Sequence, residues 1–141
     1  MAGLKLFDFT QDLLGLSLRT RAARHEILSA NIANADTPGY RPKDLDFKSV
    51  MRSAVETGAS GDAHAQDGNL MARASADIES AIYEPEYPNN RQGEDRLDGN
   101  AVSLDSQMAL LTENALGYET SLTFLQRTLA GLRYVIGEGR R

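Results

Sequence analysis

The chain has 141 residues, a net charge of −5, 41% hydrophobic residues, 6% aromatic residues, and neither Trp nor Cys. This length suits a single domain over 1–141. The negative charge argues against a nucleic-acid-binding protein, which needs basic residues to neutralise phosphates. The lack of Cys excludes disulfides and thiolate metal sites, and no apolar run approaches the ~20 residues of a membrane span. So few aromatic residues predict a thin core, which suits an elongated molecule that completes its burial by associating.

A long N-terminal helix is predicted over 5–36. Its apolar residues form two adjacent stripes at helical spacing, which together make a broad face able to meet more than one neighbour. Asn34 is the expected C-terminal cap, because asparagine tolerates the left-handed conformation that ends many helices. One stripe contains Leu13, Leu16, Thr20, Ala23, Ile27 and Ala30, and the other contains Leu14, Leu18, His25, Leu28 and Ile32.

A turn is expected directly after this helix. Pro38 disfavours helical backbone at the preceding residue. The run Thr37-Pro38-Gly39 has Pro at the second turn position and Gly at the third, where each favours a tight turn. After the turn, we expect residues 40–47 to be extended and residues 47–55 to form a short helix.

The middle of the chain, within 37–99, is acidic and rich in small polar residues. From Met51 to Asn100 it holds ten acidic and four basic residues. We expect 56–69 to be a flexible loop because it is polar and rich in Gly. A short strand or hairpin is expected at 70–83. An irregular, extended segment is expected at 84–100, where prolines and glycines lie among acids.

The C-terminal segment, 103–137, predicts the clearest helix. Its apolar residues alternate spacings of four and three over more than four heptads, the a/d pattern of a helix that packs in coiled-coil fashion. Ser103 can act as the N-cap and Asp105 adds negative charge to the first turn, while Gly137 and Gly139 favour an end to the helix. The ten apolar positions, named the seam here, are Leu104, Met108, Leu111, Ala115, Tyr118, Leu122, Leu125, Leu129, Leu132 and Ile136.

Together these elements predict a mainly α fold. The long N- and C-terminal helices are expected to pack as an antiparallel, coiled-coil-like pair. The segment between them is expected to be irregular and partly extended.

No catalytic, cofactor or metal site is predicted. The two histidines, His25 and His64, have no HxxxH or HExxH spacing, and the chain has no Cys to complete a zinc site. Asp44 and Asp46 would share a face of an extended chain, so an acid/base pair is conceivable. A solvated face, or a tie to Arg41 or Lys43, is the simpler interpretation. An enzyme is therefore the weakest of the functional hypotheses.

Residues 28–40, LSANIANADTPGY, resemble the N-terminal signature of bacterial flagellar rod and hook proteins. The runs at 43–47, 97–105 and 113–125 also resemble elements of rod proteins in this family. Ala101, Ser103 and Gln107 stand where the family pattern has Asn, Asp and Glu. The residues that the resemblance assigns to interactions are Asn31, Ile32, Asn34, Thr37, Pro38, Gly39 and Tyr40.

The resemblance implies a structural subunit of the proximal rod, which forms a helical tube that transmits torque and lets exported subunits pass. It implies a periplasmic location in the basal body, reached by flagellar type III export without a cleaved signal peptide. The implied partners are copies of itself, the rod proteins FlgC, FlgF and FliE, and the export gate and membrane ring, with no nucleic acid or small-molecule substrate. An alternative is an export-associated, chaperone-like or regulatory helical binding module.

Overall fold

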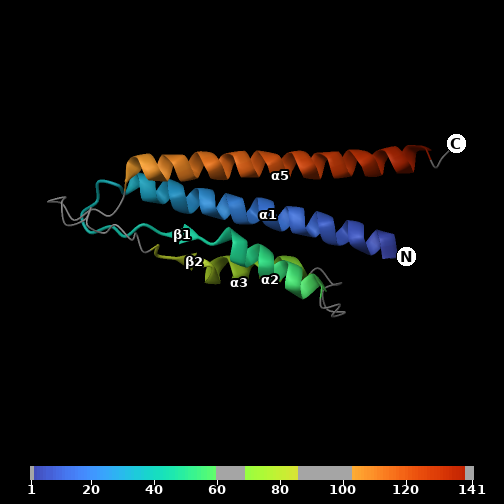
Figure 1. The fold of residues 1–141 in the computed structure, drawn as a ribbon, viewed down its shortest axis with the longest axis horizontal. Coiled ribbons are helices and arrows are strands. Elements are labelled where there is room, and N and C mark those ends of the chain that lie inside the picture. Colours follow the sequence, from blue (N-terminus) through green and yellow to red (C-terminus); the bar gives the residue numbers. More distant parts are fainter. Residues whose placement is uncertain (1, 60–68, 86–102, 139–141) are drawn as a thin grey trace.

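The computed structural model describes residues 2–59, 69–85 and 103–138. Helix α1 lies between α5 on one side and α2, α3 and the short strands on the other (Figure 1). Within the described ranges, no helix is long and apolar enough to span a membrane. The elements in chain order are α1 (Ala2–Ala33), β1 (Asp44–Leu45), α2 (Phe47–Ala59), α3 (Asn69–Ser80), β2 (Ile82–Tyr83) and α5 (Leu104–Glu138).

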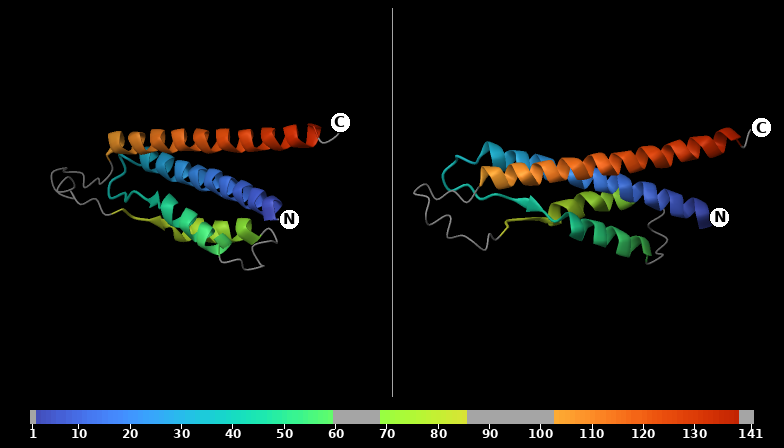
Figure 2. Two further views of the ribbon diagram at one scale, coloured as in Figure 1. Left: turned by 45° about the vertical axis from the view of Figure 1, so that its right-hand side comes forward. Right: turned by 45° about the horizontal axis from the view of Figure 1, so that its top comes forward.

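The two long helices run antiparallel, side by side (Figure 2). Asn31 near the end of α1 contacts Gln107 near the start of α5, and Ser17 earlier in α1 contacts Ser121 later in α5. The predicted mainly α fold with an antiparallel pair of long terminal helices is therefore confirmed. Helix α5 alone is about 52 Å long at 1.5 Å per residue over its 35 residues.

The helix bounds differ slightly from those predicted. Helix α1 covers Ala2–Ala33, where 5–36 was expected, and α5 covers Leu104–Glu138, where 103–137 was expected. Ser103 stands directly before α5, and its carbonyl accepts the N–H of Gln107, as expected of an N-cap residue. That residues 1–141 form a single domain stays a prediction.

The first stripe of α1 packs against the core. Leu16 is 1% exposed and belongs to a core cluster with Leu45 of β1 and Val50 of α2, against which Leu13 and Ile27 also pack. Ser17 and Asn31, which belong to neither stripe, form hydrogen bonds with α5. The first stripe therefore faces β1 and α2, and these contacts with α5 come from polar residues outside both stripes.

The end of α1 is fixed by side-chain capping and a tight turn. The Ala30 carbonyl accepts from the Asn34 backbone N–H at 3.1 Å and from the Asn34 side chain at 2.8 Å, so this residue caps the last turn. The Tyr40 N–H donates to the Thr37 carbonyl at 3.1 Å, and Gly39 has φ of 73°. This is the predicted turn, with Gly at the position that requires positive φ. The prediction that Asn34 adopts the left-handed conformation is wrong, because no described residue other than Gly has positive φ.

The prediction of a strand or hairpin at 70–83 is wrong for most of its length. Residues Asn69–Ser80 form helix α3, and only Ile82–Tyr83 form a strand. Ala74, Ile78 and Ala81 are spaced as on one helix face, and all three pack in or against the core. Helix α2 also continues to Ala59, into the expected loop at 56–69. Residues 60–68 of that loop, and most of the expected irregular segment at 84–100, lie outside the described residues.

Asp44 and Asp46 have separate structural roles. Asp46 caps α2, because its Oδ1 accepts the N–H groups of Lys48 at 3.0 Å and Ser49 at 3.2 Å. Asp44 stands in β1, which pairs antiparallel with β2. Both of its carboxylate oxygens accept from Arg24 of α1 at 2.7 Å. This bidentate pair fastens the short sheet to α1, and its hydrogen bonds raise the pKa of Arg24 despite partial burial.

We expect Asp44→Asn to lower the free energy of unfolding by about 2–4 kcal/mol, because it leaves a largely buried Arg24 without its anion. The Arg41–Glu84 pair is the matched control, with side chains 80% and 54% exposed and a distance of 3.6 Å. Glu84→Gln should cost less than about 1 kcal/mol. Urea unfolding of both variants measures the difference. Equal losses would contradict the role assigned to the Arg24–Asp44 pair.

Candidate assembly interface

Asn31 is the most highly connected polar side chain at the junction of α1 and α5. It is 1% exposed. Its Nδ2 donates to the Lys43 carbonyl at 2.7 Å and to Gln107 Oε1 at 2.9 Å. Its Oδ1 accepts from the Lys43 N–H at 3.0 Å and from the Tyr40 hydroxyl at 3.1 Å. All of the hydrogen-bonding capacity of the amide is therefore used.

These four bonds join three segments of the chain. Asn31 belongs to α1, Tyr40 and Lys43 follow the turn, and Gln107 lies in the first turns of α5. Hydrogen bonds are directional, so an amide held on all sides fixes how far α5 can slide or rotate against α1. The Asn31 site, defined as Asn31 with Tyr40, the Lys43 backbone and Gln107, sets the register of the helix pair.

The face of α5 buried against α1 is a polar row. Gln107 and Asn114 are each 1% exposed and Ser121 is half-buried, at intervals of seven residues. Asn114 Nδ2 donates to the Arg21 carbonyl at 2.8 Å, and the Ser17 and Ser121 hydroxyls lie 3.0 Å apart. The polar row, defined as Gln107, Asn114 and Ser121, thus places a hydrogen bond to α1 on successive heptads.

The seam lies beside the polar row, roughly 70° further round the helix. Leu111, Leu125 and Leu132 are half-buried, and the other seam residues are exposed. Met108 is 54% exposed and Ile136 is 70% exposed. The pairing of α1 and α5 within one subunit therefore covers the edge of the seam and leaves most of it open. Packing through the seam stays a prediction, and it concerns partners rather than α1.

Arg21 crosses from α1 to α5 next to Gly117. A Cβ at Gly117 would overlap the Arg21 guanidinium, which also lies 4.2 Å from the centre of the Phe47 ring. Burial lowers the pKa of Arg21, and nearby Arg24 lowers it further. Among the described atoms, neither Arg21 Nε nor Asn114 Oδ1 has a hydrogen-bond partner. The middle of the helix pair is therefore less well satisfied than the Asn31 site.

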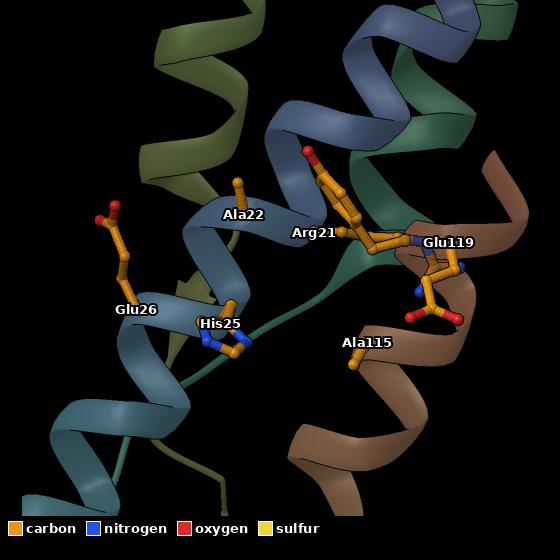
Figure 3. A pocket seen from close by; sticks show the side chains of 7 residues that line it. Arg21, Ala22, His25, Glu26, Ala115 and Glu119 are labelled. Atoms are coloured by element: carbon orange, nitrogen blue, oxygen red, sulfur yellow. The ribbon is translucent and has the colours of Figure 1, made fainter. Parts of the chain in front are cut away.

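A groove of about 370 Å³ runs between α1 and α5 (Figure 3). Its α5 wall includes the seam residues Ala115 and Tyr118 together with Glu119. Its α1 wall includes Arg21 and His25. His25, placed by the sequence on a packing stripe, is exposed here. The groove is continuous with the open seam, so both belong to one surface.

The described residues hold no group of three or more His, Asp or Glu side chains that could bind a metal ion. The conceivable acid/base pair of Asp44 and Asp46 is not formed as such, because Asp44 is bound to Arg24 and Asp46 caps α2. His64 lies outside the described residues.

The family motif is only partly assembled into one site. Asn31 and Tyr40 are bonded to each other, and Ile32 is half-buried beside them in sequence. Asn34 caps α1, while Thr37, Pro38 and Gly39 form the exposed turn that brings Tyr40 back. Their part in contacts between subunits stays a prediction.

Neither the polar row nor the Arg24–Asp44 pair was predicted from the sequence. One signal was present. Gln107, Asn114 and Ser121 repeat every seven residues directly beside the seam, and a polar heptad position next to an apolar one can specify register.

We expect Asn31→Ala to lower the free energy of unfolding by about 2–4 kcal/mol, because it leaves several buried groups unpaired. Asn34→Ala is the matched control, since its side chain donates one bond within an exposed helix end, and it should cost about 1 kcal/mol or less. Urea midpoints at unchanged slope measure both. A loss at Asn31 no larger than that at Asn34 would contradict the register role.

A model of the family described as "Flagella basal body rod protein" matches residues 17–41. This range holds the part of α1 that contacts α5 at the Asn31 site, together with the following turn. The chain is 34% identical over 138 residues to "Flagellar basal body rod protein FlgB" of Yersinia ruckeri, covering 93% of each protein. It is 37% identical to the FlgB of Salmonella typhimurium (93% and 92% covered) and 35% identical to that of Escherichia coli K12 (93% and 92%). The chain therefore belongs to the FlgB family of flagellar basal body rod proteins.

Proposed function

We infer that this chain is a structural subunit of the flagellar rod and that it assembles through the open seam of α5. The observation that carries this proposal is an apolar heptad stripe along a 35-residue helix whose polar row is buried against α1 while most of the seam stays exposed. Burying one large apolar side chain contributes about 1.5–3 kcal/mol. The free energy released by burying a stripe of this length therefore strongly favours association.

The exposed area supports the same proposal. The chain exposes 10188 Å². A compact monomer of its mass, 15.4 kDa, is expected to expose about 7,200 Å². An elongated subunit of this kind leaves much surface available for neighbours, which suits a structural role rather than catalysis.

The finer assignment follows from family membership. We place the chain in the proximal, periplasmic part of the rod, where it helps to transmit torque and encloses the path of exported subunits. Its proposed partners are further copies of itself, FlgC, FlgF and FliE, and the export gate and membrane ring. It would reach this position by flagellar type III export, without a cleaved signal peptide.

Leu122→Asp tests the seam directly, because it would place a charge where apolar packing is required. We expect loss of motility and loss of the chain from isolated basal bodies. Thr112→Asp is the matched control, since Thr112 is an exposed α5 residue outside the seam, and it should leave both unchanged. Immunoblotting of the basal-body fraction and swimming in soft agar measure the two effects.

The alternatives predict other outcomes. Normal motility and normal basal-body content with Leu122→Asp would refute the seam as the assembly surface. A soluble complex of defined stoichiometry, with none of the chain in basal bodies, would instead favour a chaperone-like or regulatory module.

A further inference from the structure

Helix α5 carries a second set of exposed apolar side chains that no described part of the subunit covers. Leu116 is 66% exposed, Phe124 is 56% exposed and Tyr134 is 66% exposed. Thr120 and Gly131 complete the row, whose members are four, four, seven and three residues apart, and a Cβ at Gly131 would meet nothing within 4 Å. We name these five residues the back face.

The back face and the seam lie on opposite sides of the helix. At 100° per residue, Leu116 and Phe124 centre roughly 180° from the seam, with the polar row and α1 between the two. One neighbouring helix cannot contact both surfaces. A closed pair made through the seam alone would leave Leu116, Phe124 and Tyr134 in water.

We propose that the seam of α5 packs against the back face of α5 from a second copy of this chain. This inference rests on the proposed function, and it adds which two faces meet. Contacts between two different faces are heterologous, so each copy still offers a free seam or a free back face to the next. The arrangement therefore grows as an open-ended stack of helices and does not close as a dimer.

The charges of α5 favour a second copy as the occupant. Between Asp105 and Arg133, the acids Glu113 and Glu119 precede the bases Arg127 and Arg133. Two parallel copies of α5 that are not displaced along the helix axis would place like charges next to each other. A second copy displaced along the helix axis brings the acidic half of one helix beside the basic half of the other, which is favourable at short range.

Cysteine cross-linking tests this arrangement, because the chain has no cysteine of its own. In each double variant, Phe124→Cys is combined with one Cys at a seam position that is at least five residues away along the chain. Such pairs are at least about 7.5 Å apart along one helix, beyond the about 7 Å that a disulfide spans. Any disulfide must then join two chains. Isolated basal bodies are mildly oxidised and analysed by non-reducing electrophoresis and immunoblotting.

We expect at least one double variant to form a ladder at multiples of 15.4 kDa. Each single variant should stay monomeric, because the seam does not meet another seam and the back face does not meet another back face. Leu116→Cys serves as a second back-face probe in case Phe124→Cys perturbs assembly. Thr112→Cys with Phe124→Cys is the matched control, since Thr112 lies on neither face.

Three outcomes would overturn the inference while the chain is present in basal bodies. These are dimers from a single seam cysteine, products joined only to a different protein, or no cross-link at any seam position with either back-face probe. Absence of the chain from basal bodies would instead overturn the proposed function itself, and the inference with it.

Discussion

The hydrogen bonds of the Asn31 amide are the interaction on which the helix pair depends. A buried amide must be fully bonded, since each unpaired group costs free energy. Asn31 meets this condition only when the end of α1, the backbone of Lys43 and the start of α5 are all in place. Tyr40 can donate to it because the turn at Gly39 reverses the chain. Two residues of the family motif, Asn31 and Tyr40, thus belong to the site that fixes helix register within one subunit.

Helix α5 therefore has three faces with different properties. Its polar row binds α1 through hydrogen bonds, which give register but little net stability. Its seam and back face are apolar and largely exposed, so they offer the burial that the subunit alone lacks. We propose that polar contacts inside the subunit set the geometry of the helix pair and that apolar contacts between subunits drive assembly.

The sequence predicted the elements whose apolar residues recur at a regular spacing and whose ends are marked by capping or turn residues. Both terminal helices, their antiparallel pairing, the Pro38–Gly39 turn and the short helix after Phe47 all followed from spacing and turn residues. Helix α3 was missed although its apolar residues share one face, because a helix of 12 residues depends on tertiary packing that its own sequence does not show. The partner of Asp44 was missed because Arg24 is 20 residues away in sequence, and only the fold brings them together.

The face of α5 that meets α1 was also missed, although its polar residues repeat every seven positions in the sequence. An a/d seam indicates that a helix packs, but it does not say whether the partner belongs to the same chain.

Gln107 is a buried residue of the Asn31 site. It departs from the Glu of the family pattern, and the structure shows its neutral amide accepting from Asn31 in a site 1% exposed, where a carboxylate would carry a larger desolvation cost.

Hydrogen exchange along α5 tests the central claim most directly, because it reports where the helix is held in place. In the dilute monomer, amides near Gln107 and Asn114 should exchange slowly. Those after Leu122 should exchange quickly there and become protected in the assembled rod. Full protection of the whole of α5 in the dilute monomer would contradict the account, because it would mean that the subunit does not need its neighbours to hold this helix.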